Sequence, residues 1–110
     1  PANYVQCGVD TKKAWELIKP YVKYLHIKDA LADGSVVPAG KGIGNVKYIL
    51  DDFKKLGGNS VTVEPHLTVF AGLRDLEKED DKSVVGEVYR YATAEEAFSA
   101  AVSALREILI

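Results

Sequence analysis

Helical and strand-like apolar patterns alternate along this chain, and that alternation most constrains what it can fold into. Three stretches repeat apolar residues at helical spacing, and two short stretches repeat them at every second position. Because a helix joins the two strand-like stretches, we expect the strands to be parallel neighbours. The predicted order is helix, strand, helix, strand, helix, over residues 10–22, 24–30, 45–56, 60–67 and 94–109.

Each predicted helix has a start signal and an apolar face. Asp10 or Thr11 can cap the first helix and Asn45 the second, while Thr93 and Glu96 form a capping box before the last. We expect the apolar faces to be buried. They comprise Ala14, Trp15, Leu17, Ile18, Tyr21 and Val22, then Val46, Ile49, Leu50, Phe53 and Leu56, and finally Ala97, Phe98, Ala101, Val102, Leu105, Ile108 and Leu109.

Two parallel strands are too few for a complete domain, because parallel sheets are normally covered on both faces and have more strands. Residues 31–44 are predicted to be a loop rich in glycine and proline, and residues 68–92 a solvated connection with many charges. The chain also begins at Pro1 and contains no methionine. We therefore expect residues 1–110 to be a single partial domain, the end of a larger repeating α/β protein.

Composition narrows the classes of function. Lys and Arg number 14 and Asp and Glu 16, so the net charge is −2, and a nucleic-acid partner is not expected. No apolar run approaches the ~20 residues of a membrane helix, so no membrane partner is expected either. The single cysteine, Cys7, is interpreted as structural and is compatible with a reducing compartment. A cytoplasmic location is the expectation.

Five polar residues lie near the ends of the two predicted strands: His26, Lys28, Asp29, Glu64 and His66. The carboxyl ends of parallel strands form the active-site rim in α/β proteins. His26 and Glu64 are 38 positions apart, which suits one strand–helix–strand step and would let them share a cation. Two simpler interpretations remain open. The fold alone could satisfy the hydrogen bonds of His26, and Lys28 and Asp29 could form only a salt bridge with each other. Glu64 is costly to bury unless it is paired, protonated or metal-bound.

The glycines at 40, 42 and 44 do not form a phosphate-binding loop. No Lys-Ser or Lys-Thr pair follows them, and their order differs from that of a dinucleotide-binding motif. Flexibility of the loop, or close approach of its backbone to a ligand, is the favoured interpretation. Trp15 is predicted to lie in the core.

Three segments together resemble a known family: 25–30 (LHIKDA), 37–44 (VPAGKGIG) and 63–67 (VEPHL). They are similar to the sugar phosphate isomerase/epimerase family, within the xylose isomerase-like TIM-barrel superfamily. The resemblance implies a (β/α)8 barrel of about 250 residues or more, of which this chain would be the C-terminal part. It would span the sixth helix to the eighth helix, and the remaining strands would lie in a missing N-terminal portion.

The resemblance also implies roles for the polar residues. His26 and Glu64 match two of the family's four metal ligands, and Glu64 matches its acid/base at the carbon next to the carbonyl. Lys28, Asp29 and His66 would then contact the substrate. Mn, Mg, Co or Zn would be the cofactor, provided that the remaining ligands are supplied. Two positions differ from the family's pattern, since Asn3 stands where a histidine is common and Lys41 where a glutamate is frequent.

The sequence therefore predicts the C-terminal portion of a metal-dependent sugar or sugar-phosphate isomerase or epimerase. Its partners would be a small sugar or sugar phosphate and the missing barrel portion, and the isolated chain is expected to be inactive. The alternative is a non-catalytic barrel fragment that self-associates, as a homo-oligomer, or packs on a partner chain. The acidic net charge disfavours a third reading, a divergent endonuclease of the same superfamily.

Overall fold

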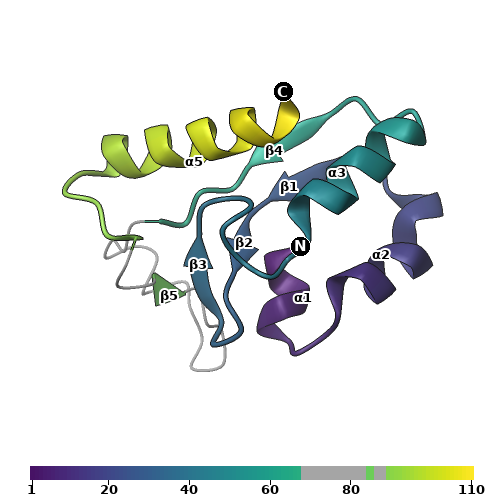
Figure 1. The fold of residues 1–110 in the computed structure, drawn as a ribbon, viewed down its shortest axis with the longest axis horizontal. Coiled ribbons are helices and arrows are strands. Elements are labelled where there is room, and N and C mark those ends of the chain that lie inside the picture. The colour runs from purple at the N-terminus through teal and green to yellow at the C-terminus, as the bar shows by residue number, and fades with distance from the viewer. Residues whose placement is uncertain (68–83, 86–88) are drawn as a thin grey trace.

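The computed structural model describes residues 1–67, 84–85 and 89–110, and it is a mixed α/β arrangement (Figure 1). No helix within those ranges is long and apolar enough to cross a membrane. The elements are α1 (Ala2–Gln6), α2 (Thr11–Ile18), the 3-10 turn η1 (Lys19–Tyr21), β1 (Leu25–Ile27), β2 (Asp29–Ala30), β3 (Ser35–Val37), α3 (Val46–Lys55), β4 (Val61–Val63), β5 (Val84–Val85) and α5 (Ala94–Leu109).

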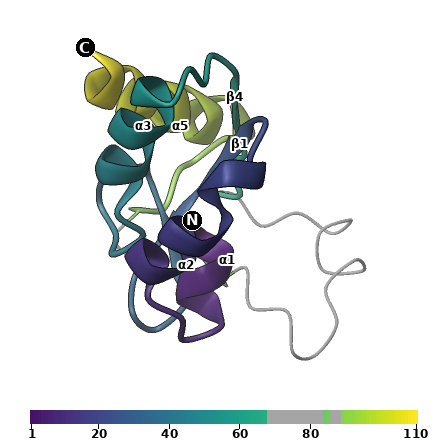
Figure 2. The same ribbon diagram turned by 90° about the vertical axis from the view of Figure 1, so that its right-hand side faces the viewer.

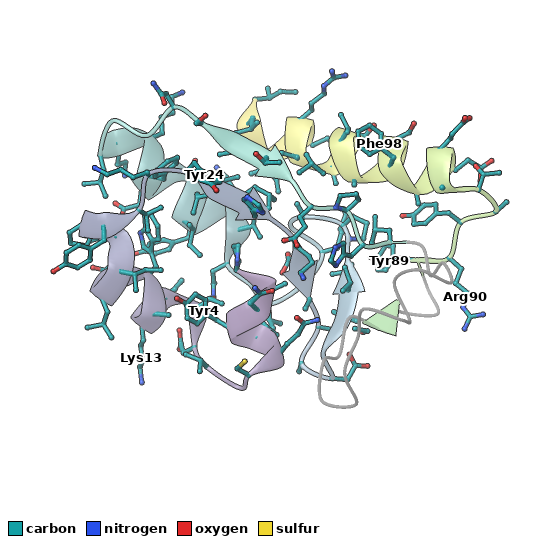
Figure 3. All side chains as sticks on the ribbon, turned by 180° about the vertical axis from the view of Figure 1, so that it is seen from behind. Tyr4, Lys13, Tyr24, Tyr89, Arg90 and Phe98 are labelled. Atoms are coloured by element: carbon teal, nitrogen blue, oxygen red, sulfur yellow. The ribbon has the colours of Figure 1, made fainter. Side chains whose placement is uncertain are left out.

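Strands β1 and β4 pair in parallel, as predicted, with Leu25 opposite Val61 and Ile27 opposite Val63. Their apolar side chains pack with the helices of the core. Figure 2 shows α3 and α5 on the same side of these two strands. Figure 3, seen from the opposite side to Figure 1, shows β1 and β4 in front of α3, with Tyr24 beside β1. One face of the pair is therefore covered by helices.

The predicted order of elements is wrong around residues 24–44. The expected strand over 24–30 breaks at Lys28, whose carbonyl oxygen accepts a hydrogen bond from the N–H of Ala2 in α1 at 3.0 Å. Beyond that break, β2 pairs antiparallel with β3, which lies inside the expected loop. A second sheet, ordered β2-β3-β5, results. Local periodicity does not predict it, because a bond to a distant helix causes the break.

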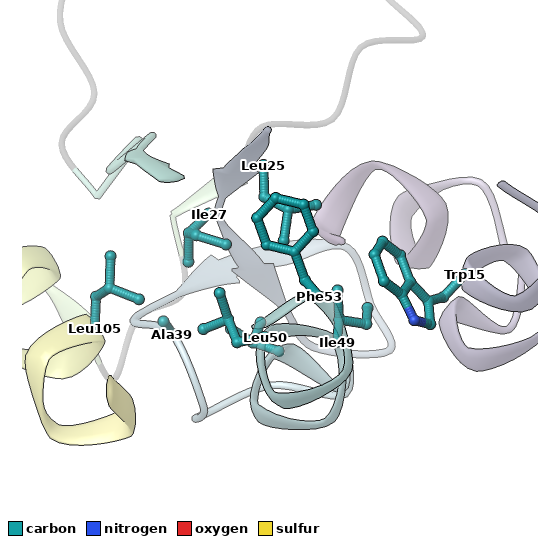
Figure 4. Close-up of a cluster of buried hydrophobic side chains, with 9 residues drawn as sticks. Trp15, Leu25, Ile27, Ala39, Ile49, Leu50, Phe53 and Leu105 are labelled. Carbon is teal, nitrogen blue, oxygen red and sulfur yellow. The ribbon is translucent and has the colours of Figure 1, made fainter. Parts of the chain in front are cut away.

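The main core lies between α2, α3 and the β1–β4 pair (Figure 4). The rings of Trp15 and Phe53 meet edge to face with their centroids 6.3 Å apart. Such contacts add to the stabilisation from burying two large apolar side chains. The predicted face of α3 is confirmed at four of its five positions, because Val46, Ile49, Leu50 and Phe53 are buried.

Other parts of the predicted apolar faces lie in solvent. Leu17 is 77% exposed although it lies within α2, because none of the described elements covers that side of the helix. Tyr21 is 80% exposed at the end of the 3-10 turn that follows α2, where the helical face does not continue. Leu56, Phe98 and Leu109 are exposed as well. The buried residues of α5 form a narrower stripe than predicted: Ala97, Ala101, Ala104 and Leu105.

The capping predictions differ in outcome. Asp10 caps α2 by accepting from the N–H groups of Lys12 and Lys13, and Thr93 caps α5 by accepting from the N–H of Glu96. Asn45 precedes α3 but makes no side-chain cap, since its side chain donates to Oγ1 of Thr11 at 2.7 Å.

The charged connection predicted over 68–92 falls mostly outside the described residues.

Candidate functional site

Asp29 is fully buried and its carboxylate is surrounded by backbone N–H groups. Oδ1 accepts from Ala30 at 2.9 Å and from Gly44 at 2.8 Å, and Oδ2 accepts from Gly40 at 2.9 Å and Gly42 at 3.0 Å. A carboxylate has about four lone-pair directions, and four donors occupy them here. Asp29 therefore holds the 40–44 loop against β2. Its predicted contact with a substrate stays a prediction.

The glycines of this loop allow the close approach that the sequence suggested, but to a group of the protein itself. A Cβ atom on Gly42 would collide with Oδ1 of Asp29 and with the carbonyl oxygen of Ala30. A Cβ on Gly44 would stand 2.6 Å from the same Oδ1. Successive backbone N–H groups around an anion form a concave binding site, and here the anion is an internal side chain. In the sequence, the only sign of this arrangement was that glycines occupy the alternate positions 40, 42 and 44 after Asp29.

Glu64 lies at the carboxyl end of β4. Its N–H donates to the carbonyl oxygen of Ile27 at 2.9 Å, which continues the parallel ladder one step past the strand. Pro65 then ends the pairing, as predicted, because it has no N–H. The backbone at His66 is left-handed (φ 42°), and its Nε2 lies 3.7 Å from Oε1 of Glu64. Both side chains are about one third exposed, so this pair is open to solvent.

Lys28 and Glu64 both line a small cavity at the carboxyl ends of β1 and β4. Its volume is about 10 Å³, close to the space that one water molecule needs. Lys28 is only 7% exposed. The other walls are mostly apolar and come from both sheets and from α5: Ile27, Val37, Pro38, Ala39, Val63, Pro65, Leu67 and Ala101.

Three of the residues predicted from the sequence lie close enough to the amino group of Pro1 for their charges to affect its pKa. Burial lowers the pKa of the Pro1 amino group, and the charges of Asp29, Lys28 and Glu64 act on the same group. These three side chains, predicted from two separate segments, therefore lie in one neighbourhood.

His26 is exposed on β1, opposite Thr62. Its ring lies against that of Tyr24, with centroids 5.3 Å apart. The structure thus pairs Glu64 with His66 rather than with His26. Across the part of the chain that the structure describes, no group of three or more His, Cys, Asp or Glu side chains is placed to hold a metal ion. The described residues do not make a metal site by themselves, and the metal prediction depends on ligands from elsewhere.

A polar cluster joins α2 to α3 away from these residues. The Trp15 ring N–H donates to Oδ2 of Asp52 at 2.7 Å, and Nζ of Lys19 lies 3.4 Å from the same oxygen. The hydrogen bond from Trp15 is the largest cause of a lowered pKa at Asp52. The prediction of Trp15 as a core residue is confirmed. Its polar partner was not predicted, because no local pattern connects residues 37 positions apart.

The larger cavity, about 480 Å³, is at the other end of the β1–β4 pair, where the turn before β4 meets the ends of α3 and α5. Phe53, Val61 and Ile108 are among its walls, and its charged side chains include the ion pair of Lys47 with Asp51. The predicted polar residues are absent from its walls, so the small cavity beside Glu64 is the candidate site. No family model, curated protein or solved structure matches the chain.

Proposed function

We propose that this chain is the C-terminal portion of a metal-dependent sugar or sugar-phosphate isomerase or epimerase with a (β/α)8 barrel. The observation that carries the proposal is Glu64, a partly exposed carboxylate at the carboxyl end of a parallel strand. It stands beside His66 and shares a cavity with Lys28. The carboxyl ends of parallel strands are where such barrels place their catalytic residues.

Glu64 is suited to moving a proton at a carbon next to a carbonyl. Its carboxylate would accept that proton as the C–H bond breaks. A proton delivered to the opposite face of the same carbon gives epimerisation, and one delivered to the former carbonyl carbon, with the hydroxyl proton moving to the other oxygen, gives isomerisation. His66, whose Nε2 lies 3.7 Å from Oε1 of Glu64, would help to position that carboxylate. Asp29 would act indirectly, by holding the 40–44 loop.

The divalent cation of the proposal would need more donors than this chain brings together. His26 and Glu64 supply one imidazole nitrogen and one carboxylate, while hard divalent cations take six or more ligands, mostly oxygen. The other ligands would come from the remaining part of the barrel. Helices cover one face of the β1–β4 pair and leave the other face open. This asymmetry supports a barrel, because barrel strands face helices on one side and the lumen on the other.

Solvent deuterium exchange tests the proposal. The chain, with any protein that co-purifies with it, is incubated with ketoses and ketose phosphates in D2O containing Mn²⁺, and deuterium at the carbon next to the carbonyl is measured by NMR. We expect exchange that E64Q abolishes and that E107Q, a change at an exposed α5 residue, leaves intact. Full exchange by E64Q would contradict the role of Glu64.

Native mass spectrometry tests the completion of the barrel. We expect the 12.0 kDa chain to travel with a larger companion of about 15 kDa or more, the remainder of a typical barrel of about 250 residues. A monomer that travels alone would lack the other metal ligands, and this outcome would overturn the proposal for this chain. A cytoplasmic location belongs to the same proposal, and the exposed free thiol of Cys7 supports it.

A second candidate function is assembly without catalysis. Large apolar side chains are exposed around α2 and the start of β1, namely Leu17, Tyr21 and Tyr24. Surfaces of this kind pack against another chain or a second copy. A symmetric homo-oligomer in the native mass spectrum, with no exchange activity, would favour this function over the first.

A further inference from the structure

The larger cavity, of about 480 Å³, has no part in the chemistry proposed above. Its walls come from α3, from the end of α5 and from the turn before β4, and both helices lie on the same side of the β1–β4 pair (Figure 2). Small-molecule sites usually have volumes of about 300–1,000 Å³ and mostly apolar walls. The buried Leu50 and Phe53 form part of this wall, and the partly buried Val61 and Ile108 continue it. The cavity therefore has the size and the lining of a site for a hydrocarbon group.

The ring of Phe53 in this wall is held in place from two sides. A Cβ atom on Gly58 would collide with the ring, so only glycine lets the turn before β4 lie against it. On its other side the ring meets that of Trp15 edge to face. A wall fixed in this way need not rearrange when a ligand binds, which lowers the cost of binding.

The charged side chains of the wall leave one positive charge without a partner. They are Lys47, Asp51 and Lys54. Nζ of Lys47 lies 2.8 Å from Oδ2 of Asp51, whereas Lys54 forms no ion pair among the described residues. The carbonyl groups at the end of α3 accept hydrogen bonds from the N–H groups of residues 56–58, so few free acceptors remain there. The charge of Lys54 therefore favours an anionic ligand.

We propose that this cavity binds an amphipathic carboxylate, a molecule with a hydrocarbon chain and one anionic head group, such as a medium-chain fatty acid. The hydrocarbon chain packs on the apolar wall and leaves water. The carboxylate lies at Nζ of Lys54, where the exposed side chains of Asn59 and Ser60 supply hydrogen-bond donors. The site is at the opposite end of the β1–β4 pair from Glu64, so it goes beyond the proposed isomerase function and does not depend on it.

Ligands with the same chain length and opposite head-group charges test the proposal. The purified chain is titrated with octanoate or octylammonium, each below the concentration at which it aggregates, and binding is followed by NMR at the backbone amides. We expect octanoate to bind several-fold more tightly than octylammonium and to shift the amides of residues 58–61 and 108–110. Equal binding of the two ligands, or octanoate shifts confined to other residues, would overturn the proposal.

The K54Q variant tests the contact with the head group. Lys54 is exposed, so its replacement should not disturb the fold. We expect K54Q to weaken octanoate binding about two- to fivefold, as loss of one exposed ion pair does, and to leave the binding of neutral 1-octanol unchanged. The matched control is K55Q, which removes the next lysine of α3, one that does not line the cavity. Equal weakening in the two variants would contradict the contact with Lys54.

The L109D variant tests the wall independently. Leu109 lines the cavity and is 53% exposed, so an aspartate there adds a negative charge without emptying the core. We expect octanoate to bind about fivefold more weakly or worse, because the carboxylates repel each other and apolar contact is lost. L17D, at an exposed leucine of α2 outside the cavity, should bind octanoate as the wild type does. Unchanged octanoate binding by L109D would refute the site.

Discussion

Two carboxylates, Asp29 and Glu64, lie at the carboxyl end of the parallel strand pair and have opposite environments. Asp29 is completely buried and accepts four backbone hydrogen bonds. Glu64 is about one third exposed and has a histidine 3.7 Å away. The first has its lone-pair directions occupied by backbone donors, whereas the second is open to solvent and to a ligand. Their different surroundings assign one residue to holding the fold and the other to chemistry.

The largest effect should follow from removing the charge at Asp29. In D29N, an amide NH2 would face backbone N–H donors that now bond to an oxygen, so buried donors would lose their acceptor. We expect a loss of about 3–5 kcal/mol in the free energy of unfolding, measured by urea denaturation. Hydrogen exchange at the amides of Gly40, Gly42 and Gly44 should accelerate. Unchanged protection there would contradict the role assigned to Asp29.

A smaller effect should follow from crowding the same carboxylate. G42A places a methyl group against Oδ1 of Asp29 and the carbonyl of Ala30, and we expect a destabilisation of about 1–3 kcal/mol. Gly57 is the matched control, because it has a positive φ (89°) and open space around a Cβ. G57A should cost only about 1–2 kcal/mol from its left-handed backbone. Equal losses in the two variants would show that the close approach is unimportant.

A third carboxylate, that of Asp52, accepts a hydrogen bond from the ring N–H of Trp15. In the folded protein the pKa of Asp52 lies below its ordinary value of 3.8. Its carboxylate therefore stabilises the fold at pH values above 3.8, and this contribution is lost as the pH falls through the lower, folded-state pKa. W15F removes the donor and part of the core, so we expect a loss of about 1–3 kcal/mol at neutral pH. In urea denaturation at a series of pH values, the gap from wild type should narrow below pH 3.8. A constant gap would mean that packing alone explains it.

The smallest effect on stability is expected at Glu64. E64Q keeps the shape of a partly exposed side chain, so its free energy of unfolding should change by less than about 1 kcal/mol. Urea denaturation beside D29N measures the contrast directly. A loss at Glu64 as large as that in D29N would remove the distinction between the two carboxylates.

Much of the fold follows from local signals. Asp10 or Thr11, and Thr93, were predicted as caps because a short polar side chain satisfies free N–H groups within one turn of its own position, and the structure uses Asp10 and Thr93. The buried face of α3 follows from apolar spacing in the same way. The exposed Leu17 and Tyr21 were not predicted, because their burial depends on how much surface the neighbouring elements cover.

The candidate site was predictable only in part. The sequence indicated Lys28, Asp29, Glu64 and His66 as a group at the strand ends, and the structure brings Lys28 and Glu64 to one cavity and His66 to Glu64. A cation shared by His26 and Glu64 stays a prediction. In the described part of the chain, the ring of His26 packs on the ring of Tyr24. Spacing along the sequence does not tell whether His26 or His66 lies nearer to Glu64, because that depends on how the chain turns after its strand.

The sequence by itself determined the three main helices, because caps and apolar spacing act within a few residues. It also determined the parallel pairing of β1 with β4, because a helix joins the two strands. Only the tertiary structure decided that the 40–44 glycines surround Asp29 and that Lys28 is buried. Both outcomes depend on contacts between segments that are far apart in the sequence. These include the hydrogen bond from the N–H of Ala2 to the carbonyl oxygen of Lys28 and the hydrogen bonds from the 40–44 loop to Asp29.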